Sequence, residues 1–336
     1  MTNEYHTPVM LAEAVEGLAI RPEGTYVDVT FGGGGHSRAI LKALGSGGRL
    51  YAFDQDGDAA ECASALMREC VGGGSSFTFI NENFSHLKAF LRLHGVRRVD
   101  GVLADLGVSS HQFDTAERGF STRFDGDLDL RMDRRNPLTA AELVNSSDEE
   151  ELCRLLRLYG ELPNARQMAR AIVRWRTADG EPRAIRTTAE LKEAVSRHLP
   201  RGMENKYLAM LFQALRIEVN GELEALKAML QQASELLAEG GRLAVISYHS
   251  LEDRLVKNFM RSGNFEGLVE KDFYGNPLSP MRQVRKCTAS AEEVACNSRA
   301  RSAMLRVGEK MKIENRELKI EIDGKQVQRE SGGGRA

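Results

Sequence analysis

Ten residues, Asp28 to Ser37, combine four consecutive glycines with an acid, a histidine and a serine in the order DVTFGGGGHS. The β-branched and aromatic run at 25–29 favours a buried strand, and apolar residues at 40, 41 and 44 favour a helix after the glycines. Glycines at such a turn let a ligand approach the backbone and leave the first N–H groups of the helix free. The turn therefore predicts a small, partly charged cofactor at the carboxyl edge of a sheet.

Three kinds of glycine-rich turn compete for this motif. A phosphate-binding loop needs Lys and then Ser or Thr after its last glycine, and His36-Ser37 at that place excludes it. A dinucleotide fingerprint would pair Gly32 and Gly34 with a third small residue, for which Ser37 is a near miss. The third candidate is S-adenosylmethionine, whose methionine end needs close backbone contact but carries no pyrophosphate. The turn alone leaves the last two open.

Two further predicted strands deliver polar residues to the same edge. The run 49–53 ends in Asp54-Gln55-Asp56, and an acid at this place can accept both ribose hydroxyls of an adenosine. The run 101–104 leads into Asp105-Leu106-Gly107-Val108-Ser109-Ser110. Because the carboxyl ends of parallel strands meet at one edge, the three strand ends together predict an adenosine ligand. They do not choose between a dinucleotide and S-adenosylmethionine.

Strand and helix patterns alternate up to about residue 112, which favours a parallel α/β sheet. The stretch after it shows only helical patterns, at 149–158, 165–175 and 188–199. A long helical pattern at 207–237, with Gly221 as a candidate interruption, and buried strands at 242–247 and 303–307 return the chain to the sheet. We expect a core of residues 1–112 and 206–323, an all-helical insertion at 113–205, and a disordered tail at 324–336.

The gross composition fits a globular intracellular protein. A chain of 336 residues exceeds one typical domain, and 42% hydrophobic residues suffice for a packed core. Its five cysteines form no C-x-x-C pair, which argues against a zinc site or a disulfide framework. Without a signal-peptide pattern or a membrane-length apolar run, we expect a cytoplasmic protein with no membrane partner.

The charge distribution is more informative than the net charge of −2. Residues 151–206 hold twelve Lys or Arg against seven Asp or Glu, and residues 281–312 hold eight against three. Basic segments on an otherwise acidic protein are what binding to a phosphate backbone requires. An ordinary solvated helix surface is the alternative for either segment.

Motifs along the chain resemble those of a known family. In order they read EYHTPVML, DVTFGGGGHS, FDQD, ADLGVSSHQFD, RGFS, LDLRMD, YGE, FQALRIEVNGEL, SYHSLEDRLVK and NSRARSAMLRV. The series resembles the bacterial 16S ribosomal RNA (cytosine-N(4)) methyltransferases, which use S-adenosylmethionine, and it spans roughly residues 4 to 308. The resemblance departs at three positions: His111 stands where proline is common, Leu130 where methionine is common and Tyr248 where phenylalanine is common.

The resemblance implies a Rossmann-like class I methyltransferase core with an inserted all-helical domain that meets the RNA. It also implies that the substrate is a cytidine in the decoding region of small-subunit ribosomal RNA. Carried over residue by residue, the cofactor contacts fall on Gly34, Gly35, His36, Asp54, Phe84, Asp105 and Gln112.

The implied reaction makes further demands, because the lone pair of a cytosine amino group is delocalised into the ring. The enzyme must align amine, methyl and sulfur, accept hydrogen bonds from the amine and remove one proton. Many amino-methylating enzymes use an Asn/Asp-Pro-Pro-aromatic loop, which the loop at 105–110 replaces here. We expect Ser109 and Ser110 to hold the amine, with His249 as a second candidate for proton removal and no metal site.

Basic side chains are the expected contacts to RNA phosphates: Arg131, Arg134, Arg135, Arg166, Arg170 and Arg174. The expected partner is small ribosomal subunit RNA, and the sequence leaves a homodimer open. Two other functions also stay open at this point. One is a non-catalytic RNA-binding ribosome assembly factor, and the other is an NAD-dependent oxidoreductase.

Overall fold

A seven-stranded sheet forms the centre of the protein in the order β3-β2-β1-β4-β5-β7-β6. The computed structural model describes residues 8–70, 74–177, 183–271, 273, 275 and 279–311, so the tail at 324–336 lies outside the described residues. The strands are β1 (Thr25–Asp28), β2 (Arg49–Phe53), β3 (Ser76–Ile80), β4 (Val99–Asp105), β5 (Leu237–Ser247), β6 (Met281–Thr288) and β7 (Met304–Lys310).

The pairing explains where a ligand can bind. Strands β1 to β5 run parallel, whereas β7 is antiparallel to both β5 and β6. Strand order reverses around β1, which lies between β2 and β4, and in such sheets ligands bind outside the carboxyl ends at this switch point. The expected Rossmann-like α/β core is thus confirmed.

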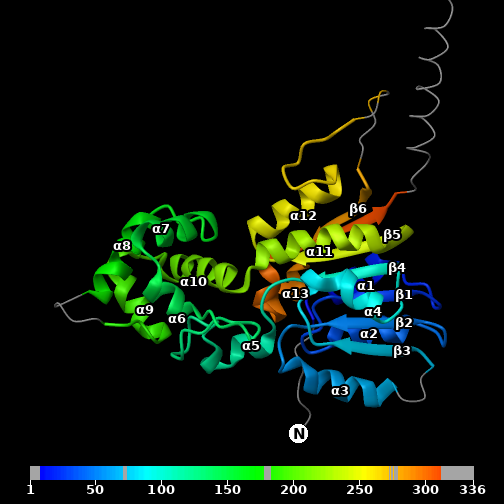
Figure 1. Cartoon of the computed structure of the whole chain (residues 1–336), viewed down its shortest axis with the longest axis horizontal. Helices are drawn as coiled ribbons and strands as arrows, with labels where there is room; N and C mark the ends of the chain where they lie inside the picture. The colour runs from blue at the N-terminus through cyan, green and yellow to red at the C-terminus, as the bar shows by residue number, and fades with distance from the viewer. Residues whose placement is uncertain are drawn as a thin grey trace, which may run out of the picture.

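Helices cover both faces of the sheet, as Figure 1 shows. One face packs on α1 (Leu11–Leu18), α2 (Gly35–Ala43) and α3 (Ala59–Cys70). The other packs on α4 (Leu87–Leu93), α11 (Glu222–Leu236) and α12 (Ser250–Ser262). Each helix buries one stripe: on α11, Leu226, Met229, Leu230 and Ala233 are all buried at helical spacing. Helix α13 (Ala291–Cys296) and the 3-10 turn η5 (Ser298–Ser302) precede β7.

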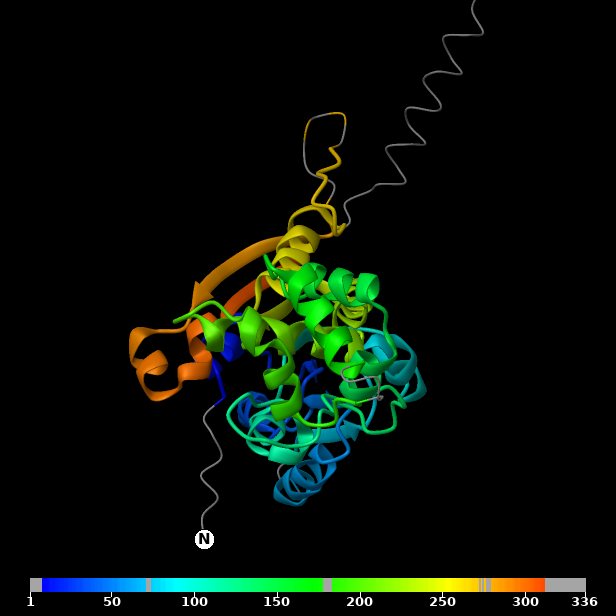
Figure 2. The same cartoon turned by 90° about the vertical axis from the view of Figure 1, so that its left-hand side faces the viewer.

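The expected helical insertion is also confirmed, and it lies to one side of the sheet (Figures 1 and 2). Its elements are α5 (Ser110–Asp114), η2 (Ala116–Arg118), α6 (Ala140–Ser146), α7 (Glu149–Leu158), α8 (Ala165–Arg176), α9 (Thr188–Val195), η4 (Ser196–His198) and α10 (Glu204–Asn220). A separate apolar cluster from Phe120 to Val219 holds the insertion together. Helix α10 packs on α7 and α6 within it, so the division expected at 205–206 falls inside α10.

Local sequence signals account for the helix ends. Thr187 caps α9 and forms a capping box with Glu190, and Gly221, at φ 59°, separates α10 from α11. The long helical pattern therefore belongs to two helices. In the part of the chain that is described, no helix combines the length and apolarity needed to cross a membrane.

Candidate functional site

The glycine turn joins β1 to α2, and its glycines have different reasons to lack a side chain. A Cβ on Gly34 (φ +77°) would lie 2.7 Å from the Phe31 ring, and one on Gly35 would lie 2.1 Å from Pro8. On Gly32 (φ +52°) the nearest atom within 4 Å would be Cβ of Ser109, at 3.8 Å. Packing thus requires glycine at positions 34 and 35, whereas position 32 leaves room for a ligand.

Asp54, directly after β2, ties the second strand end to the glycine turn. Its carboxylate accepts the N–H groups of Gly32 at 2.7 Å and of Asp56 at 2.9 Å. Burial raises the pKa of Asp54 to about 6, although both N–H groups act in the opposite direction. A carboxylate held in this way is ready to accept hydrogen bonds from a bound ligand.

Asp105 ends β4 and lies between the elements that follow β1 and β5. The Tyr248 hydroxyl donates to Oδ1 of Asp105 at 2.7 Å, and Oδ2 lies 3.7 Å from Nδ1 of His36. Burial raises the pKa of Asp105 to about 7 and lowers the pKa of His36. The buried Nε2 of His36 has no hydrogen-bond partner among the described residues. Two strand ends therefore present a carboxyl and an imidazole to each other.

The loop after β4 holds its serines in structural contacts. Ser109 caps α5: its hydroxyl accepts the Gln112 N–H at 3.2 Å, and its own N–H donates to Oε1 of Gln112 at 3.0 Å. Nε2 of Gln112 donates in turn to Oδ2 of Asp56 at 2.7 Å. Ser110 accepts a hydrogen bond from Arg299 of η5. Both serines lie where expected, and each already has a partner.

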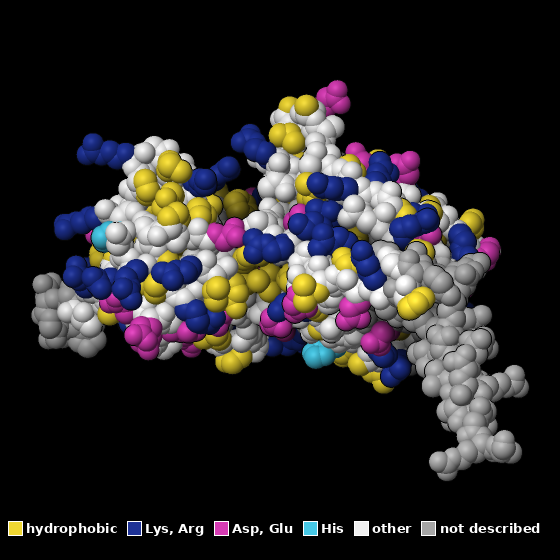
Figure 3. All heavy atoms as spheres, turned by 90° about the horizontal axis from the view of Figure 1, so that it is seen from above, with side chains coloured by type: hydrophobic (Ala, Val, Ile, Leu, Met, Phe, Trp, Pro, Cys, Tyr) yellow, Lys and Arg dark blue, Asp and Glu magenta, His cyan; other side chains and the backbone are white. Residues whose placement is uncertain are grey.

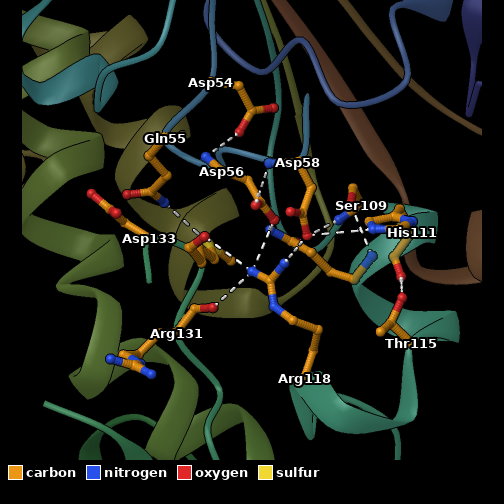
Figure 4. Close-up of polar contacts among 12 residues, drawn as sticks. Asp54, Gln55, Asp56, Asp58, Ser109, His111, Thr115, Arg118, Arg131 and Asp133 are labelled. Atoms are coloured by element: carbon orange, nitrogen blue, oxygen red, sulfur yellow. Dashed lines mark hydrogen bonds and ion pairs between the residues drawn. The ribbon is translucent and has the colours of Figure 1, made fainter. Parts of the chain in front are cut away.

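A buried arginine joins this edge to the insertion (Figure 4). Arg118 is 1% exposed, and its guanidinium lies 2.9 Å from Oδ2 of Asp56 and 2.8 Å from Oδ2 of Asp58. It also donates to the carbonyls of Arg131 and Met132 at 3.0 and 3.1 Å. Arg118 was not among the expected site residues, and its place in the RGFS motif was the only signal that singled it out.

His249 belongs to a second buried group, which is linked to Asp105 through Tyr248. Its Nε2 is 3.2 Å from Glu252, and Glu222 completes a set that could in principle ligate a metal. Arg216, however, binds both oxygens of Glu222 at 2.8 and 2.9 Å. Burial alone would raise the pKa of Glu252, but His249 and Arg216 outweigh it and lower that pKa. Of these three side chains, Glu222 is thus already paired with a guanidinium.

The structure separates the arginines expected to bind RNA into two sets. Arg131, Arg135 and Arg170 pair with acids at 2.7, 3.0 and 3.2 Å. The other three are exposed, and their guanidinium groups have no ionic or hydrogen-bond partner within the described ranges: Arg134, Arg166 and Arg174. Four basic residues of the segment 281–312 are also paired with acids: Arg282, Arg285, Arg299 and Arg306.

Phe84 begins the short turn η1 (Phe84–His86) after β3 and packs, partly buried, against the core. The preceding Asn83 donates to Gln55 at 2.6 Å, so the ends of β2 and β3 are also linked. The residues expected to contact the cofactor therefore all lie at or after the ends of neighbouring strands, at one edge of the sheet: Gly34, Gly35, His36, Asp54, Phe84, Asp105 and Gln112.

The electrostatics of this edge favour a cation over a pyrophosphate. The carboxyls of Asp54 and Asp105 both have raised pKa values because burial destabilises their charged forms. A sulfonium or an α-ammonium beside Asp105 would stabilise its carboxylate, whereas a doubly negative pyrophosphate there would be repelled by it; an acid at the place of Asp54 suits the ribose of either ligand. The residues present therefore fit S-adenosylmethionine better than a nicotinamide dinucleotide.

Comparison with known proteins agrees with this chemistry. The MraW methylase family matches residues 3–311. The Ribosomal RNA small subunit methyltransferase H of Flavobacterium johnsoniae is 55% identical over 92% of this chain and 99% of its own length. The protein of the same name from Bacteroides thetaiotaomicron is 53% identical over 91% and 97%. An rRNA methylase structure from Streptococcus thermophilus is a distant likeness, at 14% identity and a TM-score of 0.38 over 90% of this chain and 97% of that one. The chain therefore belongs to the MraW methylase family.

Proposed function

We propose that this protein transfers a methyl group from S-adenosylmethionine to the N4 amino group of a cytidine in the decoding region of small-subunit ribosomal RNA. The observation that carries the proposal is the acidic edge at Asp54 and Asp105 in a chain 55% identical to a small-subunit ribosomal RNA methyltransferase. Association into a homodimer stays a prediction.

We assign the cofactor contacts by the chemistry of each position. Asp54 would accept the ribose hydroxyls, because it lies at the end of the second strand and already presents an anchored carboxylate. Asp105 and the turn from Gly32 to His36 would hold the methionine end, since Gly32 leaves room and Asp105 offers negative charge. Phe84 would flank the adenine. When bound, S-adenosylmethionine supplies an already activated methyl group.

Ser109, Ser110 and His249 remain the proposed groups for holding the amine and removing its proton. For Ser109 two substitutions separate chemistry from helix capping, because asparagine caps a helix about as well as serine does. We expect Ser109→Asn and Ser109→Ala both to keep cofactor affinity and to lose turnover by about 10²-fold or more. Single-turnover methylation and calorimetric binding measure the two quantities. Full turnover in Ser109→Ala, which has no acceptor oxygen in its side chain, would remove Ser109 from the reaction.

Arg166 and Arg174 are the proposed phosphate contacts on α8, because they are exposed and have no partner among the described residues. Figure 3 shows Lys and Arg side chains spread over both the insertion and the core, interspersed with acids. Replacing Arg166 and Arg174 with Gln should weaken the salt dependence of RNA binding by the amount expected for the loss of about two phosphate contacts. The matched control is Arg170→Gln, whose guanidinium already pairs with Glu149 at 3.2 Å and should matter less. An unchanged salt slope in the double variant would remove α8 from the interface.

The proposed function is tested with unmodified small subunits and methyl-labelled S-adenosylmethionine, followed by mass spectrometry of the nucleosides. Label on N4 of one cytidine is the expected result. Label on a carbon of the base, or on protein, would overturn the assignment. Binding of RNA without any label would favour a ribosome assembly factor, and binding of NAD in place of S-adenosylhomocysteine would favour an oxidoreductase.

A further inference from the structure

We propose that Tyr248 is a positioning residue of the methyl-transfer site, and that its hydroxyl holds the Asp105 carboxyl so that the second oxygen faces His36. The inference rests on the proposed function, because it takes Asp105 as a contact of the cofactor. It draws on two distances at Asp105, one to the Tyr248 hydroxyl and one to the His36 imidazole.

The geometry supports a directed contact. Tyr248 follows β5 directly, and β5 pairs with β4 in a register that places Asp105 opposite Ile246, two residues before Tyr248. The hydroxyl reaches Oδ1 of Asp105 at 2.7 Å, within the range of a short hydrogen bond. Oδ2 then lies 3.7 Å from Nδ1 of His36, too far for a hydrogen bond, so it keeps its capacity to accept one.

The turn that carries Tyr248 is itself fixed. The Tyr248 N–H donates to Glu252 at 2.9 Å, and Glu252 is 2% exposed at the start of α12. Burial and the nearby Asp105 raise the pKa of Tyr248 above its usual range, so the phenol stays neutral and acts as the donor. The ring therefore presents one proton to one oxygen from a rigid support.

Several groups around Asp105 raise or lower its pKa. Burial raises its pKa to about 7, the Tyr248 hydrogen bond acts to lower it, and Glu252 and Glu293 raise it further. On the side of β1, burial raises the pKa of Asp28 and lowers the pKa of His36. Tyr248 is thus the contact among these that favours the ionised carboxyl, which a cationic ligand needs.

The test measures S-adenosylhomocysteine binding to the full chain by calorimetry between pH 5.5 and 8.5. Wild-type affinity should rise with pH through about 7, as Asp105 ionises. In Tyr248→Phe the rise should move up by about one pH unit, since the ionised form loses its donor. Affinity at pH 6.5 should fall about fivefold to tenfold and recover to within about twofold at pH 8.5.

Tyr26→Phe is the matched control, because Tyr26 is also buried and accepts the Arg21 N–H at 2.7 Å, at the opposite edge of the sheet. It should leave the pH dependence unchanged. An unshifted midpoint in Tyr248→Phe, or an equal loss at every pH, would overturn the positioning role. If wild-type protein bound no S-adenosylhomocysteine at any pH, the proposed function would fail first and this inference with it.

Discussion

Replacing Arg118 by methionine should lower the free energy of unfolding by about 3–5 kcal/mol, because it leaves buried partners without their cation. The guanidinium is 1% exposed, lies 2.9 Å from Asp56 and 2.8 Å from Asp58, and also binds two main-chain carbonyls. Methionine retains much of the side-chain volume, so the loss would come mainly from charge and hydrogen bonding. Urea denaturation followed by circular dichroism measures the change.

The control for Arg118 is an arginine from the same segment with an exposed partner. Arg135 pairs with Asp133 at 3.0 Å while its side chain is 56% exposed, so Arg135→Met should cost less than about 1 kcal/mol. Equal losses in the two variants would show that burial of the Arg118 ion pairs does not stabilise the fold.

Arg118 also connects the sheet to the helical insertion, and the fluorescence of a tryptophan can report on the insertion. The single tryptophan, Trp175, lies on α8 in the insertion, where Arg183 stacks 3.8 Å from its ring. Its fluorescence reports on the insertion, whereas circular dichroism reports on the whole chain. Separate transitions by the two probes in Arg118→Met alone would mean that Arg118 couples the insertion to the sheet.

The central strands could be predicted from the sequence because they are buried on both faces. Leu50, Tyr51, Ala52 and Phe53 of β2 are all buried, and such runs are hydrophobic without alternation. Strand β6 was missed for the opposite reason. It lies at the end of the sheet, pairs with β7 alone among the described strands, and exposes most of its residues, so its sequence MRQVRKCT has no apolar run to find.

The site was predictable to the extent that strand ends determine it. Asp54 and Asp105 follow apolar runs, and the parallel topology brings them to one edge. The partners of basic residues were not predictable in this way. Arg118 meets Asp58 across 60 residues of sequence, while Arg131 binds Asp129 two residues away. A basic residue in a loop looks the same in the sequence whether it is buried, paired or free for RNA.

Asp54→Ala should have the largest effect on cofactor binding, with a loss of about 10²–10⁴-fold in affinity for S-adenosylhomocysteine. Two hydrogen bonds from ribose hydroxyls to a carboxylate, at about 1.5–3 kcal/mol each, account for that range. Asp100→Asn is the control, since Asp100 accepts the Thr25 N–H at 2.8 Å at the opposite edge and should not affect binding. Asp54→Asn keeps one acceptor oxygen, so its loss of affinity should lie between those of Asp54→Ala and Asp100→Asn. A loss below about tenfold in Asp54→Ala would remove the ribose contact.

The pH dependence gives Asp54 a second signature, distinct from that of Asp105. Burial raises the pKa of Asp54 to about 6 and that of Asp105 to about 7, so wild-type affinity should decline in two steps as the pH falls. Each step follows from protonation of a carboxylate that the cofactor needs ionised. Asp54→Ala should lose only the lower step, whereas Tyr248→Phe should move only the upper one. If one substitution altered both steps, the two carboxyls would titrate as a coupled pair and could not be assigned separate contacts.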